Sequence, residues 1–125
     1  MQTQTAILLQ DELDDAMRAH SDWKLRLREA AVYGDTDLPV EEIKSDVCCD
    51  FGEWLQSLPH FLRNSGEVRE VDRLHKMFHA CAGGIAEQIY LGQFDIAISN
   101  LSGHEYNDLS VELAKAMMRW KLAVQ

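Results

Sequence analysis

The chain has few prolines, which break helices, and few of the basic residues that bind nucleic acid. Its 125 residues include only two prolines, Pro39 and Pro59, and no stretch alternates polar and apolar residues with β-branched enrichment. These absences argue against strands and leave helical periodicity nearly everywhere. The 12 Lys and Arg residues are outnumbered by 21 Asp and Glu, for a formal net charge of −9. Nucleic-acid binders need cations that displace phosphate counterions, so we expect no nucleic-acid partner.

Long apolar runs are missing as well. The first ten residues contain a run of only four apolar residues and no basic leader, so they read as neither a signal peptide nor a membrane span. No later segment is long enough to cross a bilayer. We therefore expect a cytoplasmic protein, whose thiols stay reduced. Its three cysteines are an odd number and two are adjacent, which favours metal binding or free thiols over a disulfide framework.

The length and a hydrophobic content of 46% suit one domain with one core, residues 1–125. Helical spacing of apolar residues predicts helices over about 5–32, 45–58 and 67–91, and a fourth from about 95 to the C-terminus with an irregularity at 102–103. Gly34 and Gly92 suit the ends of the first and third helices, and Pro59 ends the second. Short links between four helices predict an all-α fold, an antiparallel four-helix bundle in which one helix is shorter.

The first chemical signal is His75-Lys-Met-Phe-His79 in the predicted third helix. Residues four apart lie one turn apart on the same helix face, close enough for two imidazoles to share one metal ion. That face also carries apolar residues, so both rings point toward the core or its margin. Two core histidines that satisfy their hydrogen bonds without metal are the alternative interpretation.

His20 and Cys49 extend this signal. His20 takes a core-facing position of the first helix, where a polar ring needs a partner. Cys49 opens the apolar stripe of the second, shorter helix, where the interior glycine Gly52 indicates a close approach by another helix or by the metal site. A small buried thiol is the alternative for Cys49. Three imidazoles and one thiolate suit tetrahedral Zn²⁺, so we predict zinc as the cofactor, held by His20, Cys49, His75 and His79.

The order and spacing of these residues resemble a known family, the chemoreceptor zinc-binding (CZB) domains. The family pattern is HxxW, CxxGxW and HxxxH. The chain matches it with 25 residues between the first two submotifs and 20 between the last two. The matching segments are His20-Ser-Asp-Trp23, Cys49-Asp-Phe-Gly-Glu-Trp54 and His75-Lys-Met-Phe-His79.

The resemblance implies a regulatory module rather than an enzyme. Family members bind zinc through the three His and one Cys, usually form homodimers, and control chemotaxis receptors or GGDEF diguanylate cyclases. Reported roles are sensing of zinc availability and of hypochlorous acid through the zinc-bound cysteine, which assigns the redox-sensing role to Cys49. Trp23, Gly52 and Trp54 match the motif as packing residues. Any output domain on the same chain is expected to follow Gln125, an arrangement that resembles the cyclase-linked or stand-alone members of the family more than the receptors.

Three other functions compete with this interpretation. A zinc hydrolase needs an open metal position and a general base, whereas four ligands fill the tetrahedron and Lys76 stands where HExxH has its glutamate. A di-iron bundle needs Glu-x-x-His pairs, but Asp72 and Lys76 precede the two histidines by three residues. A metal-free helical interaction domain is the third. We expect structural or surface roles for the remaining prominent residues, which are Cys48, His60, Cys81, Gly83, Gly84, His104 and Trp120.

Overall fold

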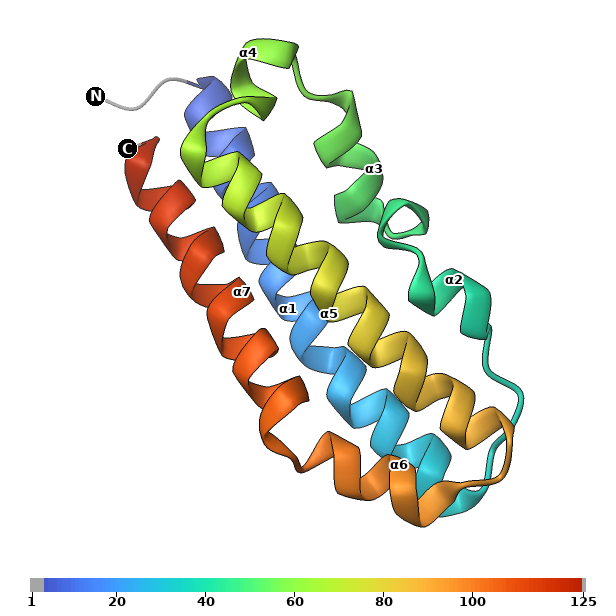
Figure 1. Ribbon diagram of the computed structural model, residues 1–125. Coiled ribbons are helices and arrows are strands. Elements are labelled where there is room, and N and C mark those ends of the chain that lie inside the picture. The colour runs from blue at the N-terminus through green and yellow to red at the C-terminus, as the bar shows by residue number, and fades with distance from the viewer. Residues whose placement is uncertain (1–3, 125) are drawn as a thin grey trace.

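Every regular element in residues 4–124, the part of the chain that the computed structural model describes, is helical (Figure 1). The expected all-α class is confirmed. Residues 1–3 and Gln125 lie outside this part. The interpretation of the first ten residues, as neither signal peptide nor membrane span, therefore falls partly on residues that are not described. No helix in residues 4–124 combines the length and apolar character that crossing a membrane requires. The elements are α1 (Gln4–Tyr33), α2 (Val40–Lys44), the 3-10 turn η1 (Asp46–Cys48), α3 (Asp50–Ser57), α4 (His60–Arg63), α5 (Gly66–Tyr90), α6 (Phe94–Leu101) and α7 (His104–Ala123).

Three long helices form the body of the molecule. α5 packs against both α7 and α1, and α1 also contacts α6 and α7. Figure 1 shows α1 and α5 running in one direction, while the α2–α4 segment and the α6–α7 segment run back the opposite way. α2 and η1 lie against α5. The chain therefore folds into antiparallel segments, of which the one from Val40 to Arg63 is built from short pieces.

The ends of the two longest helices follow the expected chemistry. Gly34 and Gly92 have positive φ angles of 70° and 78°, which only glycine adopts without strain. The amide of Asp35 donates to the Ala30 carbonyl at 2.8 Å, so the chain turns sharply after α1. At the start of α5, the Ser65 hydroxyl accepts the Val68 amide at 3.4 Å, as a helix N-cap does.

The predicted second helix over about 45–58 is wrong as one continuous element. Cys49 (φ −89°, ψ 153°) is extended and divides it into η1 and α3, and Ser45 (φ −88°, ψ 115°), also extended, separates η1 from α2. The break at Cys49 has a local cause, because its side chain accepts the Gly52 amide and so caps α3. Cys49 therefore precedes a helix instead of lying within it. α2, which lies before the predicted range, begins at Val40, directly after Pro39.

The predicted fourth helix is also two elements. The irregularity expected at 102–103 is a complete break, since Gly103 is extended (ψ 173°) and caps α7. One further short helix, α4, occupies part of the predicted loop between Pro59 and Gly66. Trp120 is 2% exposed and its ring lies 5.6 Å from that of Trp54, centre to centre, so it packs as expected. Gly83 contacts Lys44 of α2, a helix contact within the chain.

Candidate metal centre

Four side chains from three parts of the fold converge at one point. His20 comes from α1, His75 and His79 from adjacent turns of α5, and Cys49 from the junction of η1 and α3. One nitrogen of each imidazole and the Cys49 Sγ all lie within 4.8 Å of one another. In the described part of the chain no other group of three or more His, Cys, Asp or Glu side chains is arranged in this way. The structure therefore brings together all four residues predicted as ligands.

Hydrogen bonds to two backbone carbonyls fix the tautomers of two of these rings. His20 Nδ1 lies 2.6 Å from the Ala16 carbonyl and His79 Nδ1 lies 2.8 Å from the Ile43 carbonyl. A carbonyl only accepts, so each Nδ1 carries the proton and each Nε2 presents a lone pair. The two Nε2 atoms nevertheless face each other at 3.4 Å. Two lone pairs repel, so this contact calls for a cation between them.

Three of the six distances among the four donors are close to the edges of a zinc tetrahedron, and all six are within 4.8 Å. Bonds of about 2.0–2.1 Å to nitrogen and 2.3 Å to sulfur place tetrahedral donors about 3.3–3.6 Å apart. His75 Nε2 lies 3.1 Å from His20 Nε2, and the Cys49 Sγ lies 3.3 Å from His75 Nε2. With the 3.4 Å separation between His20 and His79, three edges agree with that figure within a few tenths of an ångström. The donor set and its size both fit Zn²⁺.

Burial keeps the imidazoles neutral and able to bind a metal. His75 is fully buried, and burial, followed by its imidazole neighbours, lowers its pKa to about 2. Burial likewise lowers the pKa of His20 to about 4 and lowers that of His79. The Phe51 and Phe78 rings wall the site edge-on, 5.1 Å from the His75 ring and 5.3 Å from the His20 ring. These apolar walls disfavour protonated imidazoles, so the lone pairs stay available.

Cys49 has a double role as a donor and a helix cap. Its sulfur accepts the Gly52 amide at 3.2 Å, at the positive end of α3. Burial nevertheless raises the pKa of the thiol, against the lowering effect of the amides, and the carboxylates of Asp46 and Asp50 raise it further. Without metal the thiol is protonated at neutral pH, and it must lose one proton to become a zinc ligand.

The motif residues assigned to packing lie around the site. Trp23 and Trp54 are partly buried against the core, and the Arg26 guanidinium lies 4.5 Å from the centre of the Trp23 ring. Gly52 is buried, and the expected close approach comes from the backbone of the 3-10 helix η1. A Cβ at Gly52 would lie 1.7 Å from the carbonyl oxygen of Asp46 in η1. Cys48, beside the ligand Cys49, is exposed, as are His60 and His104.

Two groups that orient the ligands were missed by the sequence analysis. The Ala16 carbonyl lies one turn before His20 in the same helix, so helical spacing alone could have identified it. The Ile43 carbonyl comes from α2, 36 residues before His79. No residue pattern marks a backbone acceptor at that distance. Such partners fix the orientation of ligating imidazoles and raise their basicity.

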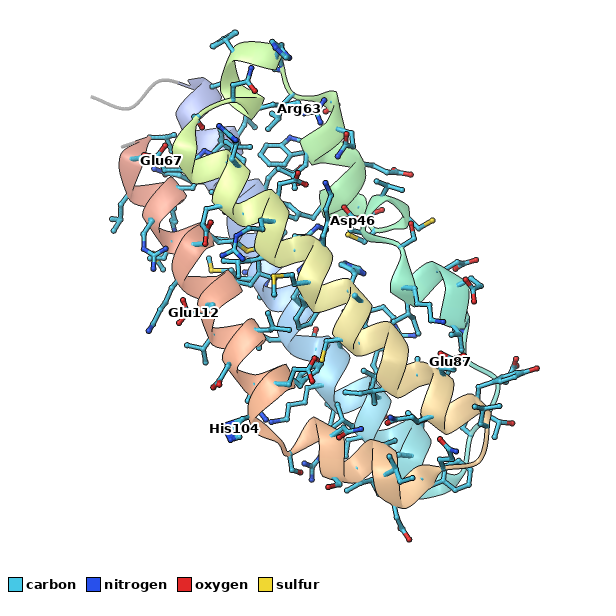
Figure 2. The ribbon with its side chains drawn as sticks, viewed as in Figure 1. Asp46, Arg63, Glu67, Glu87, His104 and Glu112 are labelled. Carbon is cyan, nitrogen blue, oxygen red and sulfur yellow. The ribbon has the colours of Figure 1, made fainter. Side chains whose placement is uncertain are left out.

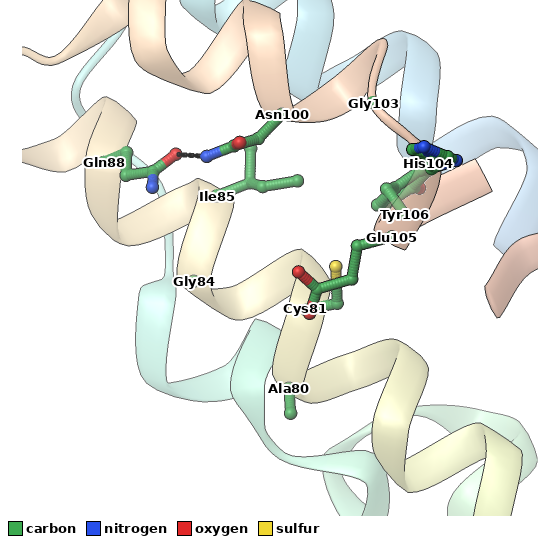
Figure 3. Close-up of a pocket in the computed structure, with 10 residues that line it drawn as sticks. All are labelled: Ala80, Cys81, Gly84, Ile85, Gln88, Asn100, Gly103, His104, Glu105 and Tyr106. Carbon is green, nitrogen blue, oxygen red and sulfur yellow. Dashed lines mark hydrogen bonds between the residues drawn. The ribbon is translucent and has the colours of Figure 1, made fainter. Parts of the chain in front are cut away.

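A separate hollow of about 390 Å³ lies between α5 and the α6–α7 junction (Figure 3). Figure 3 shows Cys81 and Glu105 on one side and the hydrogen-bonded amides of Gln88 and Asn100, 3.0 Å apart, on the other. None of the four converging donors lines it. Burial raises the pKa of the Cys81 thiol, and Glu105 raises it further. Cys81 is therefore a less reactive thiol than a metal-bound one.

Comparison with known proteins gives one match. A family model described as "Chemoreceptor zinc-binding domain" (CZB) matches residues 20–86, which are 67 of the 125 residues. The matched range starts at His20 and contains Cys49, His75 and His79. Neither the curated proteins nor the solved structures give a significant match.

Proposed function

This chain belongs to the chemoreceptor zinc-binding domain family, and we propose that it is a regulatory domain that holds one zinc ion through His20, Cys49, His75 and His79. The observation that carries the proposal is the pair of Nε2 lone pairs of His20 and His79, which face each other at 3.4 Å. A metal-free interaction domain gives no reason for that contact. Zinc supplies a positive charge that binds both lone pairs and holds the Cys49 sulfur as a thiolate.

Metal analysis of the purified protein tests this proposal. Mass spectrometry of acid digests, on protein prepared without chelators, is expected to give one zinc per chain. His75→Ala and His79→Ala should lower that stoichiometry. His60→Ala and His104→Ala should not, because both side chains are exposed and lie outside the cluster. A wild-type stoichiometry near zero would refute the zinc assignment.

The remaining parts of the functional proposal rest on the family. We propose a cytoplasmic domain that acts as a homodimer and passes its metal state to a chemotaxis receptor or a diguanylate cyclase. Donors from three parts of the fold support such a role, because metal binding then stabilises the contact of α1 with α5 and of both with the η1–α3 junction. In the antiparallel four-helix bundle that we propose, the segment from Val40 to Arg63 takes the place of one helix.

Oxidation of Cys49 is a second candidate signal. Cys49 is partly exposed, whereas the three histidines are buried, so small oxidants reach the thiolate first. Hypochlorous acid would transfer oxygen to the thiolate, which is oxidised by two electrons to sulfenic acid while chloride leaves. Sulfenic acid is a poor zinc ligand, so zinc should be released. Preferential oxidation of Cys48 or Cys81 in a mass-spectrometric map, with zinc retained, would contradict this signal.

We also propose that the domain is not an enzyme. The four donors fill a tetrahedral zinc shell, which leaves no position for a reacting water. Lys76, in the HExxH glutamate position, is exposed and pairs with Asp72 at 3.1 Å. The absence of any carboxylate from the donor group in the described chain also speaks against a di-iron centre. Assays for zinc-dependent ester or peptide hydrolysis are expected to show no turnover above that of free zinc.

A further inference from the structure

The metal centre is accessible from one side. His75 is fully buried and His79 is 3% exposed, whereas His20 and Cys49 line a surface groove of about 360 Å³ between α1 and the η1–α3 junction. We call this hollow the access groove. Ala19 also lines it, and so do the Trp23 ring and the exposed thiol of Cys48. Two of the four ligands thus form part of the groove's wall.

The charges along the access groove have one sign. Glu12 and Asp15 of α1 and Asp50 of α3 line it, and no Lys or Arg does. Two cations flank it without lining it, since Arg18 pairs with Asp15 and Arg26 lies over the Trp23 ring. A groove with carboxylates on both sides concentrates cations and repels anions, more strongly at low ionic strength.

We propose that the access groove is the route by which zinc enters and leaves the centre, and that its carboxylates speed the capture of the dication. The proposal rests on the zinc site proposed above and adds its kinetics. His75 and His79 would receive the ion from the side of His20 and Cys49, because those two ligands face the groove. The same route exposes Cys49 to neutral small molecules more readily than to anions.

The magnitude follows from Coulomb attraction. A dication about 9 Å from one carboxylate gains roughly twofold in association rate at 0.1 M salt and roughly threefold at 0.01 M. Replacing all three carboxylates should therefore slow association about eightfold at 0.1 M salt and about thirtyfold at 0.01 M. These rate factors are upper limits, because Arg18 pairs with Asp15 and offsets part of its charge.

Stopped-flow mixing of metal-free protein with zinc and a chromophoric competitor measures the association rate. The test variant is Glu12→Gln/Asp15→Asn/Asp50→Asn. Its control, Asp95→Asn/Asp108→Asn/Glu112→Gln, removes the same charge from α6 and α7, which supply no ligand. Figure 2 shows Glu112 on the opposite side of the molecule from Asp46 in η1. Slowing of the test variant by fivefold or more, with less than twofold for the control, is expected.

A second variant tests the route sterically. Ala19→Trp should narrow the access groove without touching a ligand, with Ala114→Trp, at an exposed position on α7, as the control. Narrowing raises one barrier for both directions, so association and chelator-induced release should slow by the same factor while the zinc affinity stays unchanged. Equal rates for test and control variants, in both experiments, would overturn the route. Equilibrium titration separates this result from failure of the zinc site itself, which would appear as loss of wild-type stoichiometry.

Discussion

The substitution of Gly52 by alanine isolates the contact that positions the only thiol ligand. An ideal Cβ at Gly52 would lie 1.7 Å from the Asp46 carbonyl oxygen, 2.7 Å from its carbon and 3.1 Å from the Val47 Cα. All three are backbone atoms, so no side-chain rotation can relieve the overlap. A normal carbon–oxygen contact of about 3.2 Å requires η1 to move by roughly 1.5 Å.

That movement reaches the metal centre directly. The Asp46 carbonyl accepts the Cys49 thiol at 3.4 Å, and η1 ends at the residue before Cys49. Overpacking of this kind costs about 1–3 kcal/mol in unfolding free energy. Displacement of a ligand by disturbing its supporting contacts lowers metal affinity by about 10–100-fold. We expect Gly52→Ala to show both losses.

Gly84→Ala is the matched control, because it makes the same chemical change inside α5. A Cβ there meets no atom within 4 Å. Alanine exceeds glycine by about 1 kcal/mol in helix propensity, so Gly84→Ala should be as stable as the wild type or more so. Urea unfolding followed by circular dichroism gives the stabilities, and competition with a chelator gives the zinc affinities. A Gly52→Ala variant with wild-type stability and zinc affinity would refute the reasoning.

Three further predictions concern protons and the thiol. Cys49→Ala should lower zinc affinity most, whereas Cys48→Ala, which removes an exposed thiol, should bind zinc like the wild type in equilibrium titrations. At pH 6, imidazoles with ordinary pKa values would make zinc binding release about three protons in all, but the lowered pKa values of His20, His75 and His79 predict about one, the Cys49 proton. Calorimetry in buffers of different protonation enthalpy distinguishes the two numbers. The same lowered values mean that the unfolded chain binds more protons below pH 6.5, so stability of the metal-free protein is complete above that pH and falls as the pH drops. His20 and His75 together should cost about 4 kcal/mol between pH 7 and pH 5, and identical urea midpoints at the two pH values would contradict this.

The sequence pattern predicted the long helices, and it predicted that the histidines lie on their core-facing sides, for a simple reason. Helical spacing fixes which residues share a face, so His75 and His79 had to lie together once α5 formed. The core position of His20 followed from the same periodicity. Gly34 and Gly92 were predictable as helix ends, because a positive φ is a requirement of one residue and not of its surroundings.

The segment around Cys49 was not predictable in this way. Its residues read as one helix by local preference, but the chain breaks at Cys49, which caps α3, and brings the Asp46 carbonyl close to Gly52. Such an approach is a property of the folded backbone, and the glycine indicates only that some approach occurs. The Ile43 carbonyl at His79 is unmarked in the sequence for the same reason.

The hydrogen bond from His79 Nδ1 to the Ile43 carbonyl also couples the metal centre to local opening of the fold. α2 has five residues, too few to persist as an isolated helix, and its buried Ile43 side chain and this carbonyl bond tie it to α5. A ligating imidazole donates its ring proton more strongly when a cation withdraws its electrons. Metal binding should therefore lengthen the hydrogen-exchange lifetimes of the α2 amides. By reciprocity, any molecule that holds α2 closed tightens metal binding, and one that pulls it open loosens the ion.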